Sequence, residues 1–229
     1  SHELRTPMTS IKGYADLLLL GAAGKVNEQQ QRFLTTIKTN ADRLSILVNE
    51  LLDISKLDRG TVRMSFQATD VAEIVDTSMN HLYGRIENEN KDIHVELRLP
   101  DDLPQIRADF YKLTQVLNNL LDNAFNYTYA GGRITVSAYA ELHSVVICIS
   151  DTGVGIPKDK QDRIWQRFYR DEDQPLVLES SGTGLGLAIV QEYVRMHEGE
   201  IWLESEVGQG TTFYVRLPIY TDIVVDTQP

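Results

Sequence analysis

The chain has 229 residues, which is enough for two modest domains of about 100–150 residues each. Its 42% hydrophobic and 24% charged residues are the balance of an ordinary globular protein. Lys and Arg number 22 against 33 Asp and Glu, so the formal net charge is −11, and this acidity argues against nucleic acid or an anionic membrane as a partner. It does not argue against a nucleotide that binds together with a metal ion.

The single cysteine, Cys148, excludes an internal disulfide, and its apolar surroundings indicate a buried thiol rather than a reactive one. No run approaches the ~18 apolar residues of a membrane span, so we expect that this fragment does not cross a membrane and is cytoplasmic. The chain opens at Ser1 without a start methionine. We therefore expect it to be a fragment of a longer protein, whose remaining part could carry a membrane anchor or a sensor.

The first part of the chain predicts a helical hairpin. After Pro7 apolar residues recur at spacings of three and four, and the glycines of 21–24 end that pattern. A second helix is expected to begin near Asn27, which can cap it, and to end at Asp58. Its apolar seam has the spacing of a coiled coil or four-helix bundle: Ile37, Ala41, Leu44, Val48 and Leu51. Either a partner hairpin covers this seam, giving a dimeric four-helix bundle, or the second half of the same chain does.

From Thr61 onward short β-rich runs are mixed with helical patterns. The expected strands are 61–66, 94–99, 133–138, 144–150, 200–204 and 211–217. The expected helices are 71–89, 109–126, 158–168 and 185–197. Because strands and helices do not follow a strict βαβ rhythm, we predict an α/β sandwich with its helices on one face, and an α+β class for the whole chain. Residues 171–181 show no period and are expected to form a long mobile loop.

Two asparagines stand beside the apolar stripe of the helix expected at 109–126. Asn119 and Asn123 are four residues apart, so they lie on one face of that helix. Asparagine is a poor helix former, because its amide competes for backbone hydrogen bonds. The pair is either a solvated polar edge or a pair of carbonyl oxygens offered to Mg²⁺, which takes few protein ligands besides water and substrate phosphates.

Two segments contain closely spaced glycines. Asp151 follows an apolar strand and precedes Gly153 and Gly155, which suits a tight turn approached by a flat ligand. The carboxylate could accept a hydrogen bond from an amine of that ligand. An ordinary turn has the same pattern. Glycines 182, 184 and 186 lead directly into a helix, where converging backbone N–H groups favour phosphate. This second segment is neither a P-loop nor a dinucleotide fingerprint, because it lacks Gly-Lys-Ser/Thr and follows no strand.

The chain begins with Ser-His-Glu-Leu-Arg-Thr-Pro. The order His2-Glu3 raises the possibility of a zinc protease, but Thr6 stands where that motif needs a second histidine. On a helix His2 and Thr6 share a face. By itself, a helical histidine is most often a solvated side chain.

Taken in order, these segments resemble the signature boxes of sensor histidine kinases of two-component systems. The similar segments are the histidine box at 1–7, the asparagine box at 119–124, the glycine boxes at 151–155 and 182–186, the phenylalanine box at 163–170 and a last glycine motif at 208–213. The resemblance implies a homodimerising phosphoacceptor domain in residues 1–60, a Bergerat-type ATP-binding domain in residues 61–220 and a tail in residues 221–229. It also implies ATP and Mg²⁺ as cofactors and the receiver domain of a response regulator as partner.

The resemblance implies a role for each matching residue. His2 would accept the phosphoryl group, Glu3 would take its proton, Thr6 would orient water for dephosphorylation of the partner, and Arg170 would reach the terminal phosphate. Asn123 would coordinate Mg²⁺. The residues expected to bind the nucleotide are Asn119, Asn123, Tyr127, Asp151, Gly153, Gly155, Gly182, Gly184 and Gly186.

Two positions depart from the family's pattern, and one of them, Trp165 in place of the commoner phenylalanine, is expected to affect packing only. Asn126 stands where a lysine or arginine is usual, so we expect Arg167, Arg170 or Lys158 to supply the missing positive charge. This departure is also the feature that favours an alternative, a nucleotide-binding signalling scaffold with little kinase activity. A chaperone-like or DNA-repair-like ATPase of the same nucleotide fold is a further alternative, but such proteins lack a histidine box.

Overall fold

The computed structural model describes residues 2–171 and 182–221, with only the backbone of residues 2–5. The loop expected at 171–181 and the tail expected at 221–229 therefore fall almost wholly outside the described residues. Two compact units make up the chain, Ser1–Val62 and Arg63–Pro229. None of the described helices is both long and apolar enough to cross a membrane.

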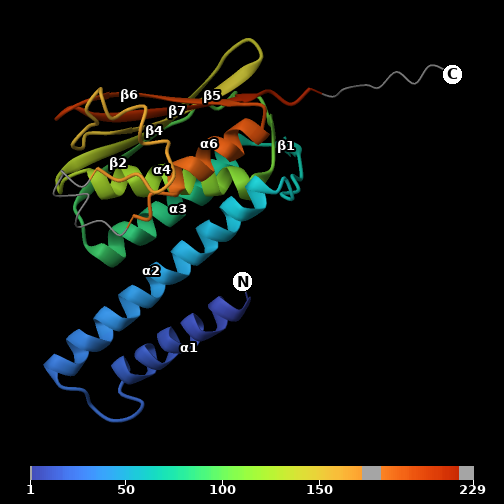
Figure 1. The fold of residues 1–229 in the computed structure, drawn as a ribbon. Helices are drawn as coiled ribbons and strands as arrows, with labels where there is room; N and C mark the ends of the chain where they lie inside the picture. The colour runs from blue at the N-terminus through green and yellow to red at the C-terminus, as the bar shows by residue number, and fades with distance from the viewer. Residues whose placement is uncertain (1, 172–181, 222–229) are drawn as a thin grey trace. The chain divides into compact units, whose positions relative to one another are not determined.

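The first unit is a helical hairpin of α1 (His2–Leu19) and α2 (Glu28–Asp58) (Figure 1). The predicted start of α2 is confirmed, because Asn27 Oδ1 accepts from the Gln30 backbone N–H at 2.9 Å and Gln30 Oε1 accepts from the Asn27 backbone N–H at 2.9 Å. Such a reciprocal capping box satisfies two N–H groups that the helix leaves unpaired. The predicted end at Asp58 is also confirmed, since Arg59 forms the C-cap.

Small residues and ion pairs hold the two helices of this hairpin together. Ala15 and Ala41 are buried. Lys12 Nζ lies 2.7 Å from Asp42 Oδ1, and Lys38 Nζ lies 2.6 Å from Asp16 Oδ1. These exposed pairs add little stability in water, but both require the same register between the helices. Much of the predicted seam stays exposed: Ile37, Leu44 and Leu51.

The second unit is built around a five-stranded sheet with the order β2-β4-β5-β7-β6. The strands are β2 (Ile93–Arg98), β4 (Gly132–Ala140), β5 (Ser144–Asp151), β6 (Glu200–Glu206) and β7 (Gly210–Pro218), and only the β2–β4 pair is parallel. Figure 1 shows α3 (Val71–Glu89), α4 (Phe110–Tyr127) and α6 (Gly186–Met196) on one face of this sheet. The predicted α/β sandwich and α+β class are confirmed.

The apolar faces of α4 and β5 meet in the core of this unit. The buried residues include Leu113, Val116, Leu117, Leu120 and Leu121 of α4, and Val145, Ile147 and Ile149 of β5. Cys148 is buried as predicted, and burial raises the pKa of its thiol, which keeps it protonated and unreactive. On the far side of the sheet Trp202 stacks on Tyr214 with ring centroids 5.1 Å apart.

Two short strands form a separate antiparallel pair, β1 (Gln67–Thr69) with β3 (Ile106–Ala108). The strand predicted at 61–66 was wrong, and β3 was not predicted. The physical reason lies at Ser65, whose backbone N–H donates to Asp109 Oδ2 at 2.8 Å instead of to a neighbouring strand. Asp109 is also the N-cap of α4, so the same carboxylate ties the start of the second unit to that helix.

The helix predicted at 158–168 was also wrong, because these residues form successive turns. Their backbone hydrogen bonds include short i+3 steps, as from Arg163 N to Lys160 O at 2.9 Å and from Gln166 N to Arg163 O at 3.0 Å. Phe168 ends the segment at φ 65°, in the left-handed region that no α-helix can pass through. Trp165 instead packs edge-on against Phe213 of β7 at 6.0 Å.

Candidate functional site

Helix α4 positions the two asparagines. Asp109 begins the helix, because its Oδ1 accepts from the Lys112 backbone N–H at 3.1 Å. The buried stripe then fixes the rotation of α4, so Asn119 and Asn123 lie half-buried at the edge of the core. Asn119 Nδ2 is 3.5 Å from the Gly186 carbonyl oxygen at the start of α6. The structure thus brings the asparagine segment next to the second glycine segment.

Asp151 is the last residue of β5 and only 7% exposed. Its Oδ1 accepts from the Gly153 backbone N–H at 2.8 Å and from the Thr211 backbone N–H at 3.3 Å. Burial raises the pKa of Asp151 to about 6, against the opposing effect of these two hydrogen bonds. Within the described part of the chain both bonds fall on Oδ1, so Oδ2 is the oxygen available to accept a hydrogen bond from a ligand.

The turn after Asp151 needs its glycines, because two other segments approach its backbone closely. A Cβ on Gly153 would lie 2.2 Å from Tyr127 O, and a Cβ on Gly155 would lie 2.0 Å from Glu206 O. Gly155 is also at φ 69°, which favours glycine. The Val154 N–H donates to Tyr127 O at 3.1 Å. This turn therefore lies directly against the C-terminal end of α4, with Tyr127 beside it.

The second glycine segment joins the phenylalanine segment to α6. Gly184 is at φ 75°, and its carbonyl accepts from the Phe168 N–H at 2.9 Å. The Leu185 N–H donates to Thr183 Oγ1 at 3.2 Å, and α6 begins at Gly186. A helix N-terminus that follows a glycine-rich turn offers converging N–H groups and favours anions. Gly182 precedes this turn and is half-buried.

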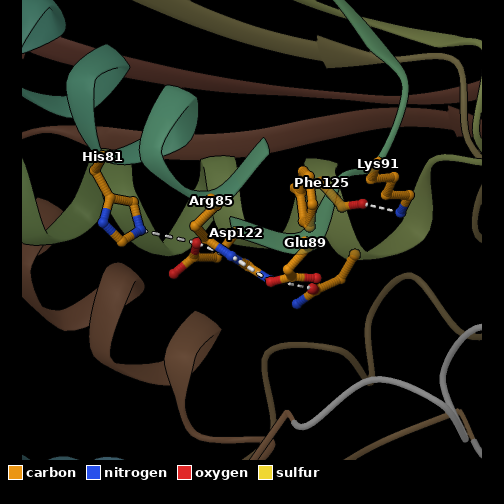
Figure 2. Close-up of polar contacts among 7 residues, drawn as sticks. His81, Arg85, Glu89, Lys91, Asp122 and Phe125 are labelled. Atoms are coloured by element: carbon orange, nitrogen blue, oxygen red, sulfur yellow. Dashed lines mark hydrogen bonds and ion pairs between the residues drawn. The ribbon is translucent and has the colours of Figure 1, made fainter. Parts of the chain in front are cut away.

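Sequence reasoning missed a polar network between α3 and α4. Arg85 Nη1 donates to Asp122 Oδ1 at 2.7 Å, and Arg85 Nη2 donates to Asn126 Oδ1 at 3.0 Å. His81 Nε2 lies 3.0 Å from the same Asp122 oxygen. Figure 2 shows the His81 ring and Arg85 both directed at Asp122. A signal was present in the sequence, because His81, Arg85 and Glu89 recur every four residues and so lie on one face of a helix.

The charges in this network stabilise one another. Burial alone would raise the pKa of Asp122, but hydrogen bonds from His81 and Arg85 hold it below the usual value. The hydrogen bond to Asp122 raises the pKa of His81. Arg85 Nη2 also donates to Glu89 Oε1 at 2.6 Å. The described structure therefore puts Arg85 against Asn126, where we had expected another cation.

The other cations expected near the site come from the segment before residue 172. Arg170 is half-buried, and Arg167 and Lys158 are exposed. Lys160 of the same segment forms an ion pair with Asp171, with 2.5 Å between Nζ and Oδ1.

The predicted phosphoacceptor lies in the first unit. Helix α1 begins at His2, and the side chains of His2 and Glu3 lie outside the described residues. Thr6 is exposed one turn later.

The residues gathered in the second unit fit a nucleotide with its metal ion. An acceptor oxygen at the end of β5, a turn with two glycines and a helix N-terminus suit an amine, a flat ring and phosphates respectively. No group of three His, Cys, Asp or Glu that could hold a metal occurs among the described residues. The amide oxygens of Asn119 and Asn123 suit Mg²⁺, which completes its coordination with water and phosphate oxygens.

Two family models match the chain. One, described as "Histidine kinase-, DNA gyrase B-, and HSP90-like ATPase", matches residues 108–221, and the other, "His Kinase A (phospho-acceptor) domain", matches residues 1–60. Drug sensory protein A of Synechocystis sp. (strain ATCC 27184 / PCC 6803 / Kazusa) is 37% identical over 98% of this chain and 35% of its own length. Sensor histidine kinase WalK of Bacillus subtilis (strain 168) is 37% identical over 95% of this chain and 35% of its own length.

The chain thus spans about a third of the length of these relatives. Among solved structures, full-length ShkA in complex with AMPPNP has a TM-score of 0.77 and 28% identity, over 96% of this chain and 44% of that one. The Acinetobacter baumannii histidine kinase AdeS shares the fold, with a TM-score of 0.67 and 24% identity over 96% of this chain and 99% of its own. On these matches, which cover both units, the chain belongs to the histidine kinase family.

Proposed function

We propose that this chain is the catalytic core of a sensor histidine kinase, which transfers the terminal phosphoryl group of ATP to His2. The observation that carries the proposal is the buried Asp151 carboxylate, held by two backbone N–H groups in a glycine turn against α4. The Gly186 end of α6 beside Asn119 provides the matching anion site. The ShkA structure, which is similar to this chain, is a complex with the ATP analogue AMPPNP.

In this proposal the adenine base binds at the first glycine turn. Asp151 Oδ2 accepts a hydrogen bond from the exocyclic amine, which a guanine base would not offer at the same position. Gly153 and Gly155 let this turn pack directly against Tyr127 and Glu206, because any Cβ there would meet their backbone atoms. Tyr127, whose carbonyl fixes the turn, lines the edge of the ring.

The phosphates then bind between α4 and the second glycine segment. Backbone N–H groups near Gly182, Gly184 and Gly186 face the phosphate oxygens, as the anion preference of a helix N-terminus favours. Asn123 would hold Mg²⁺ through its amide oxygen, and Asn119 would support the phosphates. When bound, Mg²⁺ offsets the negative charge of the group being transferred, and Arg170 contributes a positive charge at the terminal phosphate.

The proposed reaction forms a bond between a ring nitrogen of His2 and the terminal phosphorus, while the bond from that phosphorus to the ADP oxygen breaks. A neutral imidazole has one lone-pair nitrogen for this attack, and its ordinary pKa of ~6.5 keeps it mostly neutral at cell pH. Glu3 accepts the N–H proton as positive charge develops on the ring. The phosphoryl group passes next to an aspartate of a response regulator, and Thr6 orients the water that later removes it from that aspartate.

Transfer of labelled phosphate tests this function. The chain, and a version extended at its N-terminus, would be incubated with Mg²⁺ and ATP labelled on the terminal phosphate, beside His2→Gln and the matched exposed-histidine control His143→Gln. We expect label that is lost in acid, survives base, persists in His143→Gln and disappears in His2→Gln.

Acid-stable label, or label that persists in His2→Gln, would contradict the role of His2. ATP binding without any label would support the second candidate, a nucleotide-binding scaffold, which the uncommon Asn126 favours. Failure to bind ATP would remove the catalytic proposal altogether.

A further inference from the structure

We infer that Asn126 is a phosphate-binding residue and that Arg85 is the positioning residue that turns its amide toward the nucleotide. This inference rests on the proposed function, because it concerns the same nucleotide site. It follows from the hydrogen bond of 3.0 Å between Arg85 Nη2 and Asn126 Oδ1, which joins α3 to α4. The resemblance to the family implied a positive charge near Asn126, and the described structure supplies Arg85.

The guanidinium of Arg85 is held firmly in place. It lies over the ring of buried Phe125, with Cζ 4.4 Å from the ring centroid, and it donates to Asp122 and Glu89 as well as to Asn126. Figure 2 shows Arg85 between Asp122 and Glu89, with the Phe125 ring beside it. A planar guanidinium with this many fixed partners loses little additional freedom when it orients one more group.

The chemistry of arginine settles which way the Asn126 amide faces. A guanidinium has only donors, so the atom of Asn126 that contacts it must be the carbonyl oxygen. The NH₂ group of the same amide then points away from Arg85, and its N–H bonds are polarised by the positive charge behind them. Asn126 thereby becomes a hydrogen-bond donor of fixed direction.

The position of Asn126 on α4 directs those donors to the proposed phosphate site. Residues three and four apart lie on one face of a helix, so Asn126 follows Asn119 and Asn123 along the same face. All three side chains are half-buried. Because Asp122 and Glu89 offset most of the charge of Arg85, the contribution comes from the oriented N–H groups rather than from a bare cation.

A double-mutant cycle on nucleotide binding tests the inference without relying on catalysis. Affinities for Mg²⁺·ATP and for adenosine would be measured for the chain, Asn126→Ala, Arg85→Met and the double variant. Each single change should weaken ATP binding by about tenfold and leave adenosine binding unchanged, because a hydrogen bond to a charged group is lost and the base contacts remain. The double variant should bind ATP no more weakly than the weaker single variant, because Arg85 acts through Asn126.

Matched controls separate this role from a structural one. Arg195→Met removes an exposed arginine that pairs with Glu192 on α6, and it should change neither affinity. Asn126→Ala keeps the Arg85–Asp122 contact, so thermal unfolding should show that it remains folded even if Arg85→Met does not.

Equal losses for ATP and adenosine, no loss for ATP, or additive effects in the double variant would each overturn the inference. If the unchanged chain binds adenosine and ATP but the variants match it, only this inference fails. If the unchanged chain binds neither, the proposed function fails with it.

Discussion

At the scale of single residues, Asp151 carries two opposing demands. Its carboxylate is buried, which disfavours the ionised form and raises its pKa to about 6. The proposed contact with an adenine amine needs that same ionised form, because a carboxylate accepts hydrogen bonds with both oxygens. The ionised form of Asp151 therefore costs stability in the free protein, although its Oδ1 accepts two backbone hydrogen bonds there.

We therefore predict that Asp151→Asn makes the ligand-free protein more stable and binds adenosine more weakly. The pKa of Asp151 in the folded state lies above the ordinary 3.8. The contribution of this carboxyl group to stability is therefore fully present below pH 3.8 and is lost as pH rises through about 6. At pH 7 the neutral amide avoids that loss, a gain on the order of 2 kcal/mol. Urea unfolding at pH 5 and pH 7 would show whether the gain is larger at pH 7.

Adenosine affinity of the same variant should fall at least tenfold, because the amide NH₂ would face the amine of the base. Unchanged adenosine affinity would contradict the assignment of Asp151. A gain in stability of equal size at both pH values would contradict the proposed effect of burial.

A second residue, His197, links the end of α6 to the start of α4. Its Nδ1 lies 2.7 Å from Tyr193 O, and its Nε2 accepts from the Asp109 backbone N–H at 3.1 Å. Both contacts require the neutral ring with its proton on Nδ1. Burial lowers the pKa of His197 below the ordinary 6.5, despite those hydrogen bonds.

We predict a decline in stability below pH 6.5 that depends on this ring. The folded-state pKa is lowered, so the unfolded state takes up the proton first and stability falls as pH decreases from 6.5 toward the folded value. His197→Ala should cost about 2–3 kcal/mol at pH 7.5, since it leaves a buried N–H unpaired, and should flatten the decline. Urea unfolding between pH 5 and 8 would measure both, with exposed His143→Ala as the control.

At the scale of elements, the glycine turn after β5 depends on the hairpin of β6 and β7. Gly155 at φ 69° lies so close to β6 that a Cβ would be 2.0 Å from Glu206 O. Gly131 at φ 80° has the same kind of backbone but open space around it. The two positions therefore separate backbone strain from steric contact.

Gly155→Ala should lower the free energy of unfolding by about 3 kcal/mol or more, whereas Gly131→Ala should cost only about 1 kcal/mol of backbone strain. Adenosine affinity should also fall in Gly155→Ala, because the turn must move away from β6. Urea unfolding and adenosine titration of both variants would measure these effects. Equal costs at the two positions would show that the close approach of Glu206 is unimportant.

Local signals explain how much of the fold the sequence could predict. Asn27 and Asp58 mark the ends of α2 because capping depends on neighbouring residues, and the burial of β4 and β7 alternates along each strand. The turns at 158–168 could not be predicted in this way, because Trp165 is drawn to Phe213, which is distant in the chain. The pairing of 67–69 with 106–108 depends likewise on a partner about forty residues away.

The same distinction applies to the candidate site. The glycine turns and the asparagine pair could be named from the sequence because each lies within a few residues, and their roles stay predictions. The Thr211 N–H that holds Asp151 and the Arg85 side chain that holds Asn126 come from other elements. Only the fold brings these partners together.

At the scale of the whole molecule, the hairpin predicts a dimer. Leu44 is 50% exposed on the seam of α2, and a second copy of the hairpin would cover it. Leu44→Glu should shift the chain to a monomer, because burying an unpaired carboxylate in such a seam is costly. Analytical ultracentrifugation would measure the shift, and Leu142→Glu, at a residue 86% exposed in the second unit, should leave the dimer intact. Identical masses for all three proteins would contradict dimerisation through this seam.

The hydrogen bond from Ser65 to Asp109 also limits how far the second unit can travel. Six peptide links separate Arg59, the cap of α2, from Ser65, and they span at most about 20 Å when fully extended. The second unit is therefore joined to the hairpin by a short segment whose far end is held at the N-cap of α4, the helix that carries the two asparagines.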